Sequence, residues 1–391
     1  MKKYGVILYV ESDNFGDDIQ TYVASKLLPH VDYVIDREHM DTFSSDHHEP
    51  VFCIMNGWYL YETINWPPSK DTIPLPISMH FTYSMLSYPS SKDLFVLCLN
   101  RYFNFFSKYG VGCRDTATVN LLKKDIRNVY LSYCLTLTLN KFDIPDPDHD
   151  YICLVDVSDK VRDYVYKNAS CEVREYTHDY RNKTFENISF EDRMNNVEER
   201  LKIYQNAKCV ITSRYHAAMP SLALGTPVVL IPSSYEPNRF ADLDDLLCIC
   251  NENDFISGNV FDINHPKSNS KKYVEIADDL RKRVKQFIDD DGIIDTYSEL
   301  ISFCDVKDYL KQLEKLSLEN SNLKRILWAN HSYVHNDEDG KINSFKRELD
   351  LADERYLQLN EKYNDVIRSR SWKITALYRK IGGFIKKVLK K

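Results

Sequence analysis

Short apolar runs of the kind that form buried strands alternate with helical patterns along most of the chain, and this alternation restricts the fold more than any other feature. In the first part we expect strands at 6–10, 33–35, 51–55, 94–97 and 111–113, with helices at 17–28 and 116–124. Strands and helices that alternate in this way form a parallel sheet covered by helices. Residues 1–144 are therefore predicted to be one α/β domain.

A second unit follows a predicted linker at 145–148, where two prolines and flanking acids cannot continue a strand or a helix. Beyond it we expect strands at 151–157, 171–176, 209–212 and 227–231, and helices from 159, at 190–205, at 217–224 and at 271–289. The same rhythm predicts a second α/β domain over 145–304. The last helix is expected to pack back across this unit.

From residue 305 the pattern changes to heptads. Apolar residues recur at spacings of three and four through 305–366, which predicts a coiled coil and self-association through it. Asn320 and Asn330 take seam positions, where they would limit the register at some cost in stability. The alternative is an antiparallel helical hairpin that turns at Asp339 and Gly340. The sequence does not choose between the two.

The segment 367–391 is basic and amphipathic, with Trp372, Leu377 and Phe384 among its apolar residues. Residues 366–391 carry nine Lys or Arg and no acid, which predicts contact with an anionic membrane surface. The alternatives are a solubilising tail and a helix that docks on another protein. Gly382 and Gly383 weaken the segment as a continuous helix.

Length and charge exclude two classes of protein. A chain of 391 residues that is 43% hydrophobic can bury real cores, so disorder throughout is excluded. Removing the nine positive charges of 366–391 from the net charge of −7 leaves −16 on the rest. We therefore expect no nucleic-acid binding by the main body.

The cysteines indicate a reducing compartment, because ten of them occur without C-x-x-C or zinc-ligand spacing. Cys53, Cys98, Cys153 and Cys209 fall in strand-like runs, where a thiol acts as a small apolar group. No apolar stretch approaches the roughly 20 residues that span a bilayer. Together with the basic tail, this predicts a cytoplasmic protein, peripheral at the inner face of the cell membrane. Neither a metal nor a cofactor is expected.

The segment 209–230 places an arginine and a histidine two residues apart where a strand gives way to a helix. Ser213 is the expected N-cap of that helix, with Arg214 and His216 beside it. Backbone N–H groups at a helix N-terminus attract anions, the guanidinium adds a permanent charge, and the imidazole exchanges a proton near neutral pH. The pattern suits an anionic substrate that undergoes acid–base chemistry. A cap, a surface arginine and a structural histidine are the alternative.

The loop after the first strand, E-S-D-N-F-G-D-D-I-Q, turns at Asn14 and Gly16 and leads into a helix that begins near Asp17. Loops at the carboxyl ends of parallel strands are where such sheets bind ligands. The other glycines of a dinucleotide motif are missing. Asp17 and Asp18 would repel a pyrophosphate, so sugar hydroxyls are the better candidate ligand. Alternatively, the two aspartates only complement the helix dipole.

Further polar residues follow other apolar runs. Asn56 and Gly57 are expected in a loop after the strand that ends at Met55. Arg114 and Asp115 follow the strand at 111–113; a binding role for Arg114 has a local salt bridge to Asp115 as its alternative. His80 follows the run P-L-P-I-S-M, and a structural role is its alternative. The segment Y-E-P-N-R-F after the strand at 227–231 adds three candidate contacts, among them an arginine for the same anion as Arg214: Tyr235, Asn238 and Arg239.

Several motifs together resemble the polysaccharide pyruvyl transferase family. They are N-F-G-D-D-I-Q, N-G-W with W-P-P-S, I-S-M-H, V-G-C-R-D, Y-C-L-T-L-T-L, and T-S-R-Y-H followed by A-L-G-T-P, in this order over roughly residues 1–250. The resemblance implies two Rossmann-like domains in an arrangement like that of GT-B glycosyltransferases, with the active site between them. Phosphoenolpyruvate would be the donor, and a sugar of a bacterial surface glycan or its lipid-linked precursor the acceptor.

The family's histidine falls on His216, and its arginines fall on Arg214 and Arg114. Many members have lysine after Y-D-P, whereas this chain has Asn238 followed by Arg239. The arginines would hold the donor's phosphate and carboxylate, while His216 protonates the enol carbon or takes the proton of a sugar hydroxyl.

Two other functions are compatible with the sequence. One is a glycosyltransferase that uses a nucleotide sugar on the same architecture. The other is a non-catalytic scaffold for glycan assembly, which Asn238 favours.

Overall fold

The computed structural model of the protein describes residues 2–10, 12–59, 68–81, 109–123, 126–145, 149–180, 188–233 and 240–296. Several predicted features lie outside these ranges and stay predictions. They are the strand at 94–97, the coiled coil at 305–366, the basic tail at 367–391, and three site residues: Tyr235, Asn238 and Arg239.

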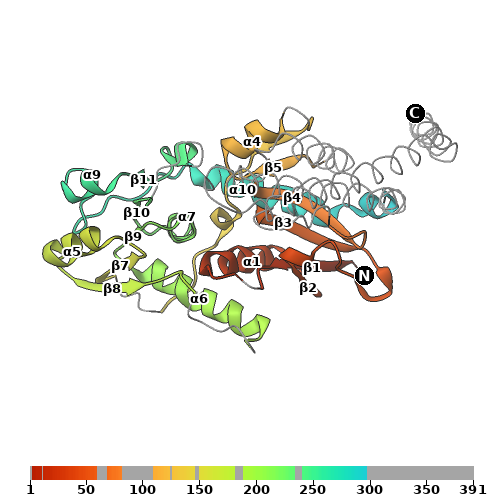
Figure 1. Ribbon diagram of the computed structural model, residues 1–391, viewed down its shortest axis with the longest axis horizontal. Helices are drawn as coiled ribbons and strands as arrows, with labels where there is room; N and C mark the ends of the chain where they lie inside the picture. The colour runs from red at the N-terminus through yellow and green to blue at the C-terminus, as the bar shows by residue number, and fades with distance from the viewer. Residues whose placement is uncertain are drawn as a thin grey trace, which may run out of the picture.

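Six parallel strands form the first sheet, in the order β2-β1-β3-β4-β5-β6 (Figure 1). We call it the N-terminal sheet. Helices α1 (Phe15–Leu27) and α4 (Thr116–Leu122) follow β1 and β5, and two short 3-10 turns, η1 (Arg37–His39) and η2 (Asp46–His48), follow β2. The strands are β1 (Lys3–Leu8), β2 (Tyr33–Asp36), β3 (Val51–Tyr59), β4 (Thr72–Phe81), β5 (Val111–Cys113) and β6 (Val129–Leu131).

Five parallel strands form the C-terminal sheet, in the order β11-β10-β9-β7-β8. The predicted α/β class with two parallel sheets is confirmed. The strands are β7 (Tyr151–Val155), β8 (Glu172–Tyr176), β9 (Cys209–Thr212), β10 (Val228–Leu230) and β11 (Cys248–Ile249). The remaining elements of this part are α5 (Asp159–Asn168), α6 (Phe190–Asn206), α7 (Tyr215–Ala223), η4 (Ala241–Leu243) and α9 (Glu252–Ile256).

Strands β3 and β4 depart from the sequence prediction. The prediction that Asn56 and Gly57 lie in a loop after Met55 is wrong, because β3 continues to Tyr59 across a bulge between Met55 and Gly57. Strand β4 carries two prolines and includes His80. Pro74 and Pro76 lie two residues apart, in the half of β4 that pairs only with β3 among the described strands. Proline is tolerated where a strand has a neighbour on one side only.

Helix α10 (Tyr273–Asp289) returns from the C-terminal sheet to the N-terminal sheet, and η5 (Asp291–Thr296) follows it (Figure 1). The ring of Phe287 packs edge-on against Phe52 of β3, with 5.3 Å between centroids. Lys2 donates a hydrogen bond to the carbonyl of Ile288 and pairs with Asp291. The helix also lies against η3 (Leu135–Thr138), just before the predicted linker. The last helix, which we expected to pack back across the second unit, thus extends to the N-terminal sheet.

A cluster of buried apolar residues runs from the N-terminal sheet through α1 and α7 into the C-terminal sheet. Cys53, Cys153 and Cys209 are buried in strands, as predicted for small apolar groups, whereas Cys98 lies outside the described residues. In the described part of the chain, no helix is both long and apolar enough to span a bilayer.

Candidate active site

Loops from the carboxyl ends of the two sheets meet at the boundary between them. Asn14, after β1, forms an isolated antiparallel bridge with Asp179, after β8. The N–H of Phe15 donates to the carbonyl of His178 at 2.8 Å, and the N–H of Tyr180 donates to the carbonyl of Asp13 at 2.6 Å. These backbone bonds hold the loop that begins α1 against the C-terminal sheet. The predicted motifs of the two domains therefore lie side by side.

His216 stands in the first turn of α7 and is 7% exposed. Gly16, from the other half of the chain, lies against it. A β-carbon added to Gly16 would lie 2.8 Å from the β-carbon of His216 and 2.9 Å from its Nδ1, so only a glycine leaves room for this ring. The oxygen of Asn14 accepts a hydrogen bond from the N–H of Gly16 and caps α1. The sequence-predicted residues Asn14, Gly16 and His216 thus come together.

Arg114 lies directly after β5 and is only 3% exposed. Its guanidinium carbon stands 5.1 Å from the centre of the Tyr215 ring, and that ring meets His216 edge-on with 5.2 Å between centroids. Within the described ranges, no ion pair or hydrogen bond engages the guanidinium, so the local salt bridge with Asp115, which was the alternative to a functional role, does not form. A buried guanidinium held only by an aromatic ring is suited to bind an anion.

Arg214 is positioned by Asp156 at the end of β7. Its Nε donates to a carboxylate oxygen of Asp156 at 2.7 Å. The same oxygen accepts from the N–H of His178 at 2.9 Å. These hydrogen bonds, with one from the Thr177 side chain, outweigh burial and hold the pKa of Asp156 below its ordinary value. Arg214 is therefore oriented by a carboxylate in the loop region at the boundary of the sheets.

The prediction that Ser213 caps α7 is wrong. Arg214 occupies the N-cap position, and its side chain makes no capping hydrogen bond. The hydroxyl of Ser213 instead donates to the carbonyl of Asp156 at 2.5 Å. Asp156 has a positive φ of 51°, a conformation that aspartate tolerates better than most residues. Ser213 therefore supports the turn that presents Asp156 to Arg214.

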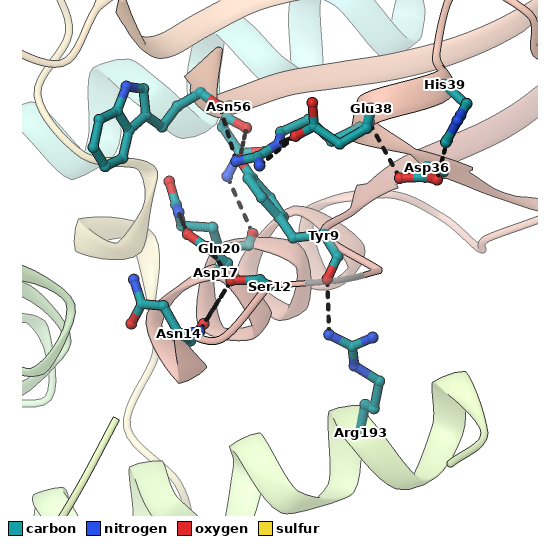
Figure 2. A network of polar contacts seen from close by, with 12 residues as sticks. Tyr9, Ser12, Asn14, Asp17, Gln20, Asp36, Glu38, His39, Asn56 and Arg193 are labelled. Carbon is teal, nitrogen blue, oxygen red and sulfur yellow. Dashed lines mark hydrogen bonds and ion pairs between the residues drawn. The ribbon is translucent and has the colours of Figure 1, made fainter. Parts of the chain in front are cut away.

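Asp17 is buried in a polar network around the start of α1, which Figure 2 shows. One carboxylate oxygen accepts from the hydroxyl of Ser12 at 2.5 Å, and the other accepts from the amide of Gln20 at 3.0 Å. Burial raises the pKa of Asp17, while the Ser12 hydrogen bond and the charges of Arg37 and Arg114 oppose the rise. The carboxyl group therefore lies close to Arg114 but already has two protein partners.

Asp18 faces the other way and joins the two halves of the molecule. Its carboxylate accepts two hydrogen bonds from Arg193 of α6, one of them from Nε at 3.2 Å. Arg193 also donates to the backbone carbonyl of Tyr9, so it ties α6 to the end of β1 (Figure 2). Burial raises the pKa of Asp18 to about 6, against the opposing effect of Arg193. The structure therefore gives this predicted sugar-binding residue an interdomain ion pair.

Asn56 and Gly57 shape the bulge in β3. The amide of Asn56 donates to the carbonyl of Gln20 at 3.1 Å, and its own carbonyl accepts from the hydroxyl of Tyr9 at 3.2 Å. Gly57 has a φ of 123°, and a β-carbon there would lie 1.5 Å from the Tyr9 hydroxyl. Only glycine fits this position. Asn56, which Figure 2 shows beside the start of α1, therefore helps to fix this polar network.

His80 forms a short hydrogen bond with Asp115, 2.6 Å from Nδ1 to the carboxylate. The other oxygen of Asp115 caps α4, accepting from the N–H of Thr118 at 2.8 Å and from its hydroxyl at 2.9 Å. The partners of Asp115, with His80 the largest, outweigh burial and keep its pKa below the ordinary value. Trp58 meets the His80 ring edge-on at 5.6 Å.

A family model described as polysaccharide pyruvyl transferase matches residues 14–235. The chain belongs to this family. As a member of the pyruvyl transferase family, the protein is a transferase. The match includes most of the residues brought together here, from Asn14 and Arg114 to His216, and it ends before Asn238 and Arg239. None of the curated proteins matches the chain significantly.

Several solved structures resemble this pyruvyl transferase family member distantly. One is a functionally uncharacterised protein, KP1_0663, from Klebsiella pneumoniae, with 17% identity, a TM-score of 0.39, and coverage of 64% of this chain and 93% of that one. Another is S. aureus MnaA in complex with UDP, with 9% identity, a TM-score of 0.34, and coverage of 76% and 91%. A third is a UDP-N-acetylglucosamine 2-epimerase, with 10% identity, a TM-score of 0.36, and coverage of 73% and 95%.

Four residues of the site have no distinct signal in the sequence of this pyruvyl transferase family member. Tyr215 stands between Arg214 and His216 but has no charge of its own that suggests a role. Asp156 and Arg193 form ion pairs with residues that are distant in the sequence. Arg37 stacks on the Tyr9 ring at 4.3 Å and donates to the carbonyl of Trp58. No group of three or more potential metal ligands occurs among the described residues.

Proposed function

We propose that the protein transfers pyruvate from phosphoenolpyruvate to a sugar of a bacterial surface polysaccharide, or of its lipid-linked precursor, as a ketal. Family membership supports the class of reaction. The observation that carries the choice of donor is the buried guanidinium of Arg114, which has no hydrogen-bonded carboxylate partner in the described part of the chain and adjoins Tyr215, the ring that contacts His216. Such a charge binds the carboxylate or phosphate of a small anion.

The donor would lie between the two sheets, in an arrangement like that of GT-B enzymes. Arg114 comes from the N-terminal sheet and Arg214 from the C-terminal sheet, so a bound anion would bridge the two. Arg214 donates to Asp156 through Nε. In this proposal its two terminal nitrogens donate hydrogen bonds to the bound anion. Arg239 would add a third positive charge.

His216 would supply the proton that the enol carbon of the donor gains. A sugar hydroxyl attacks C2 as C3 is protonated, the phosphate then leaves, and a second hydroxyl closes the ketal. General acid–base help of this kind contributes about 10² to 10⁴ in rate. The same arginines would stabilise the charge on the departing phosphate.

The experiment mixes the purified protein with phosphoenolpyruvate and a panel of p-nitrophenyl glycosides. We expect release of inorganic phosphate, and a product heavier than the glycoside by one pyruvic acid less one water. His216→Ala should lower the rate by about 10² to 10⁴ with an unchanged thermal unfolding curve.

A parallel incubation offers uridine diphosphate sugars in place of phosphoenolpyruvate. Release of uridine diphosphate there, without phosphate release from phosphoenolpyruvate, would replace the proposal with glycosyl transfer. If phosphate is released from phosphoenolpyruvate, mass spectrometry of the surface glycan from a deletion strain would identify the natural acceptor by its lost pyruvate.

A further inference from the structure

The pairing of His80 with Asp115 fixes which nitrogen of the imidazole carries the proton. Asp115 is buried, and its lowered pKa keeps the carboxylate ionised, so it can only accept hydrogen bonds. With 2.6 Å between them, Nδ1 of His80 must donate to Asp115. In the neutral ring this leaves the lone pair on Nε2. Asp115 is itself held by Thr118 at the start of α4, so the orientation is built into the fold.

This pair adjoins Arg114 through the backbone, and the charge of Arg114 helps to lower the pKa of Asp115. Asp115 is the next residue in the chain, and the N–H of Arg114 donates to the carbonyl of Met79, the residue before His80. Tyr215 lies between Arg114 and His216. Arg114 is thus connected to His80 through Asp115 and to His216 through Tyr215. The charge of Arg114 also acts on Asp17, which Arg37 and Asp13 influence as well.

Ketal formation requires more proton transfers than one imidazole can perform at once. In the first stage C3 must gain a proton while the attacking hydroxyl loses one, on different faces of the reacting centre. We propose, building on the pyruvyl transfer proposed above, that His80 is the acid–base group for the sugar hydroxyl and that Asp115 is its positioning residue. His216 then donates the proton to C3.

The proton transfers balance over the cycle. In the first stage the hydroxyl oxygen bonds to C2 and gives its proton to Nε2 of His80, while the π pair of C2=C3 takes a proton from His216. In the second stage the bond between C2 and the phosphate oxygen breaks, the electron pair leaves on phosphate, and His80 returns its proton to that phosphate. The second hydroxyl bonds to C2 and gives its proton to His216, which restores both histidines.

The chain contains a matched control for this pair. Nδ1 of His48 lies 3.0 Å from the buried carboxylate of Asp71, which directly precedes β4 and so stands at the opposite end of that strand from His80. Neither residue belongs to the site described here. Variants of the two pairs therefore separate the loss of a histidine–carboxylate contact from the loss of a catalytic group.

The kinetic experiment compares His80→Asn and Asp115→Asn with His48→Asn and Asp71→Asn. Asparagine caps a helix about as well as aspartate, so Asp115→Asn keeps the start of α4 and removes only the charge. We expect kcat for pyruvyl transfer to fall about 10² to 10⁴-fold in His80→Asn, and clearly in Asp115→Asn, with an unchanged Kd for phosphoenolpyruvate. Asp115→Glu should recover part of the rate. Equal effects in the His48 and Asp71 variants would overturn the proposal.

A second readout does not depend on activity. Nitrogen-15 chemical shifts of histidine side chains report the tautomer, and the signal of His80 is assigned by its loss in His80→Asn. We expect the tautomer with the proton on Nδ1 in the wild type and its inversion in Asp115→Asn. The proton on Nε2 in the wild type would overturn the proposed role. If the tautomer is as expected but phosphoenolpyruvate neither binds nor reacts, the donor assignment fails, and with it the step given to His80.

Discussion

Gly16 and His216 touch across the boundary between the two sheets, although 200 positions separate them in the chain. The space at Gly16 is so small that a methyl group would lie within 2.9 Å of the imidazole. Gly16→Ala should therefore displace His216, and we expect kcat/KM to fall about 100-fold, since a misplacement of about 1 Å can cost that much. Alanine is the better helix former, so α1 itself should not weaken.

Steady-state kinetics and thermal unfolding of Gly16→Ala test this expectation. Gly5→Ala is the control, because a β-carbon at Gly5 would press on side chains of Ile35 and Val51 at 3.0 Å, inside the N-terminal sheet and away from His216. The control should lose stability and keep its kcat/KM. Full activity in Gly16→Ala would show that His216 can move without consequence.

Arg114→Met removes the charge of the buried guanidinium and keeps most of its volume over Tyr215. A hydrogen bond to a charged group contributes about 1.5 to 3 kcal/mol, so the Kd for phosphoenolpyruvate should rise about 10- to 100-fold. Isothermal titration calorimetry measures the change. Arg283→Met is the matched control, because Arg283 also stacks on a tyrosine, Tyr130, but pairs with Asp279 on α10. An unchanged Kd for Arg114→Met would remove this residue from the donor site.

The ion pair of Asp18 with Arg193 is almost completely buried, with side chains 3% and 6% exposed. Arg193→Met leaves the carboxylate without its partner, and we expect the free energy of unfolding to fall by about 3 to 5 kcal/mol. The double variant Asp18→Leu with Arg193→Met should recover most of this loss, because it leaves no unpaired charge. Urea unfolding of the single and double variants measures both effects. A double variant as unstable as Arg193→Met would contradict the explanation.

His178 predicts how stability depends on pH. Burial, with the nearby charge of Arg200, lowers its pKa from 6.5 to about 3. The unfolded chain takes up a proton below pH 6.5 and the folded protein does not, so the contribution to stability is complete above that pH and is lost as the pH falls toward 3. The slope is about 1 kcal/mol per pH unit. His178→Phe should lack this pH dependence, which is measured as the free energy of unfolding in urea between pH 7 and pH 4. The same pH dependence in the wild type and the variant would refute the role given to His178.

Local patterns in the sequence predict which elements form, because each strand and helix carries its own periodicity. The strand at Cys209–Thr212 matches the predicted range, and the loop with Asn14 and Gly16 does approach the segment with His216. The bulge at Gly57 could not be predicted, since it depends on the hydroxyl of Tyr9, which a strand 47 residues away brings close to Asn56. The partners of Asp18 and Arg214 are likewise distant in sequence: Asp156 reaches Arg214 when β7 and β9 pair, and Arg193 reaches Asp18 only when the two parts of the molecule pack.

The return of α10 to the N-terminal sheet bears on how the chain can be divided. Phe52 of β3 is covered by Phe287, so a fragment limited to residues 1–144 would leave an apolar face in water. We expect such a fragment to aggregate, whereas one that also supplies residues 273–296 should refold with it by complementation. The N-terminal sheet is therefore not an autonomous folding unit. During synthesis on the ribosome it can be completed only after α10, which follows the strands of the C-terminal sheet, has been made.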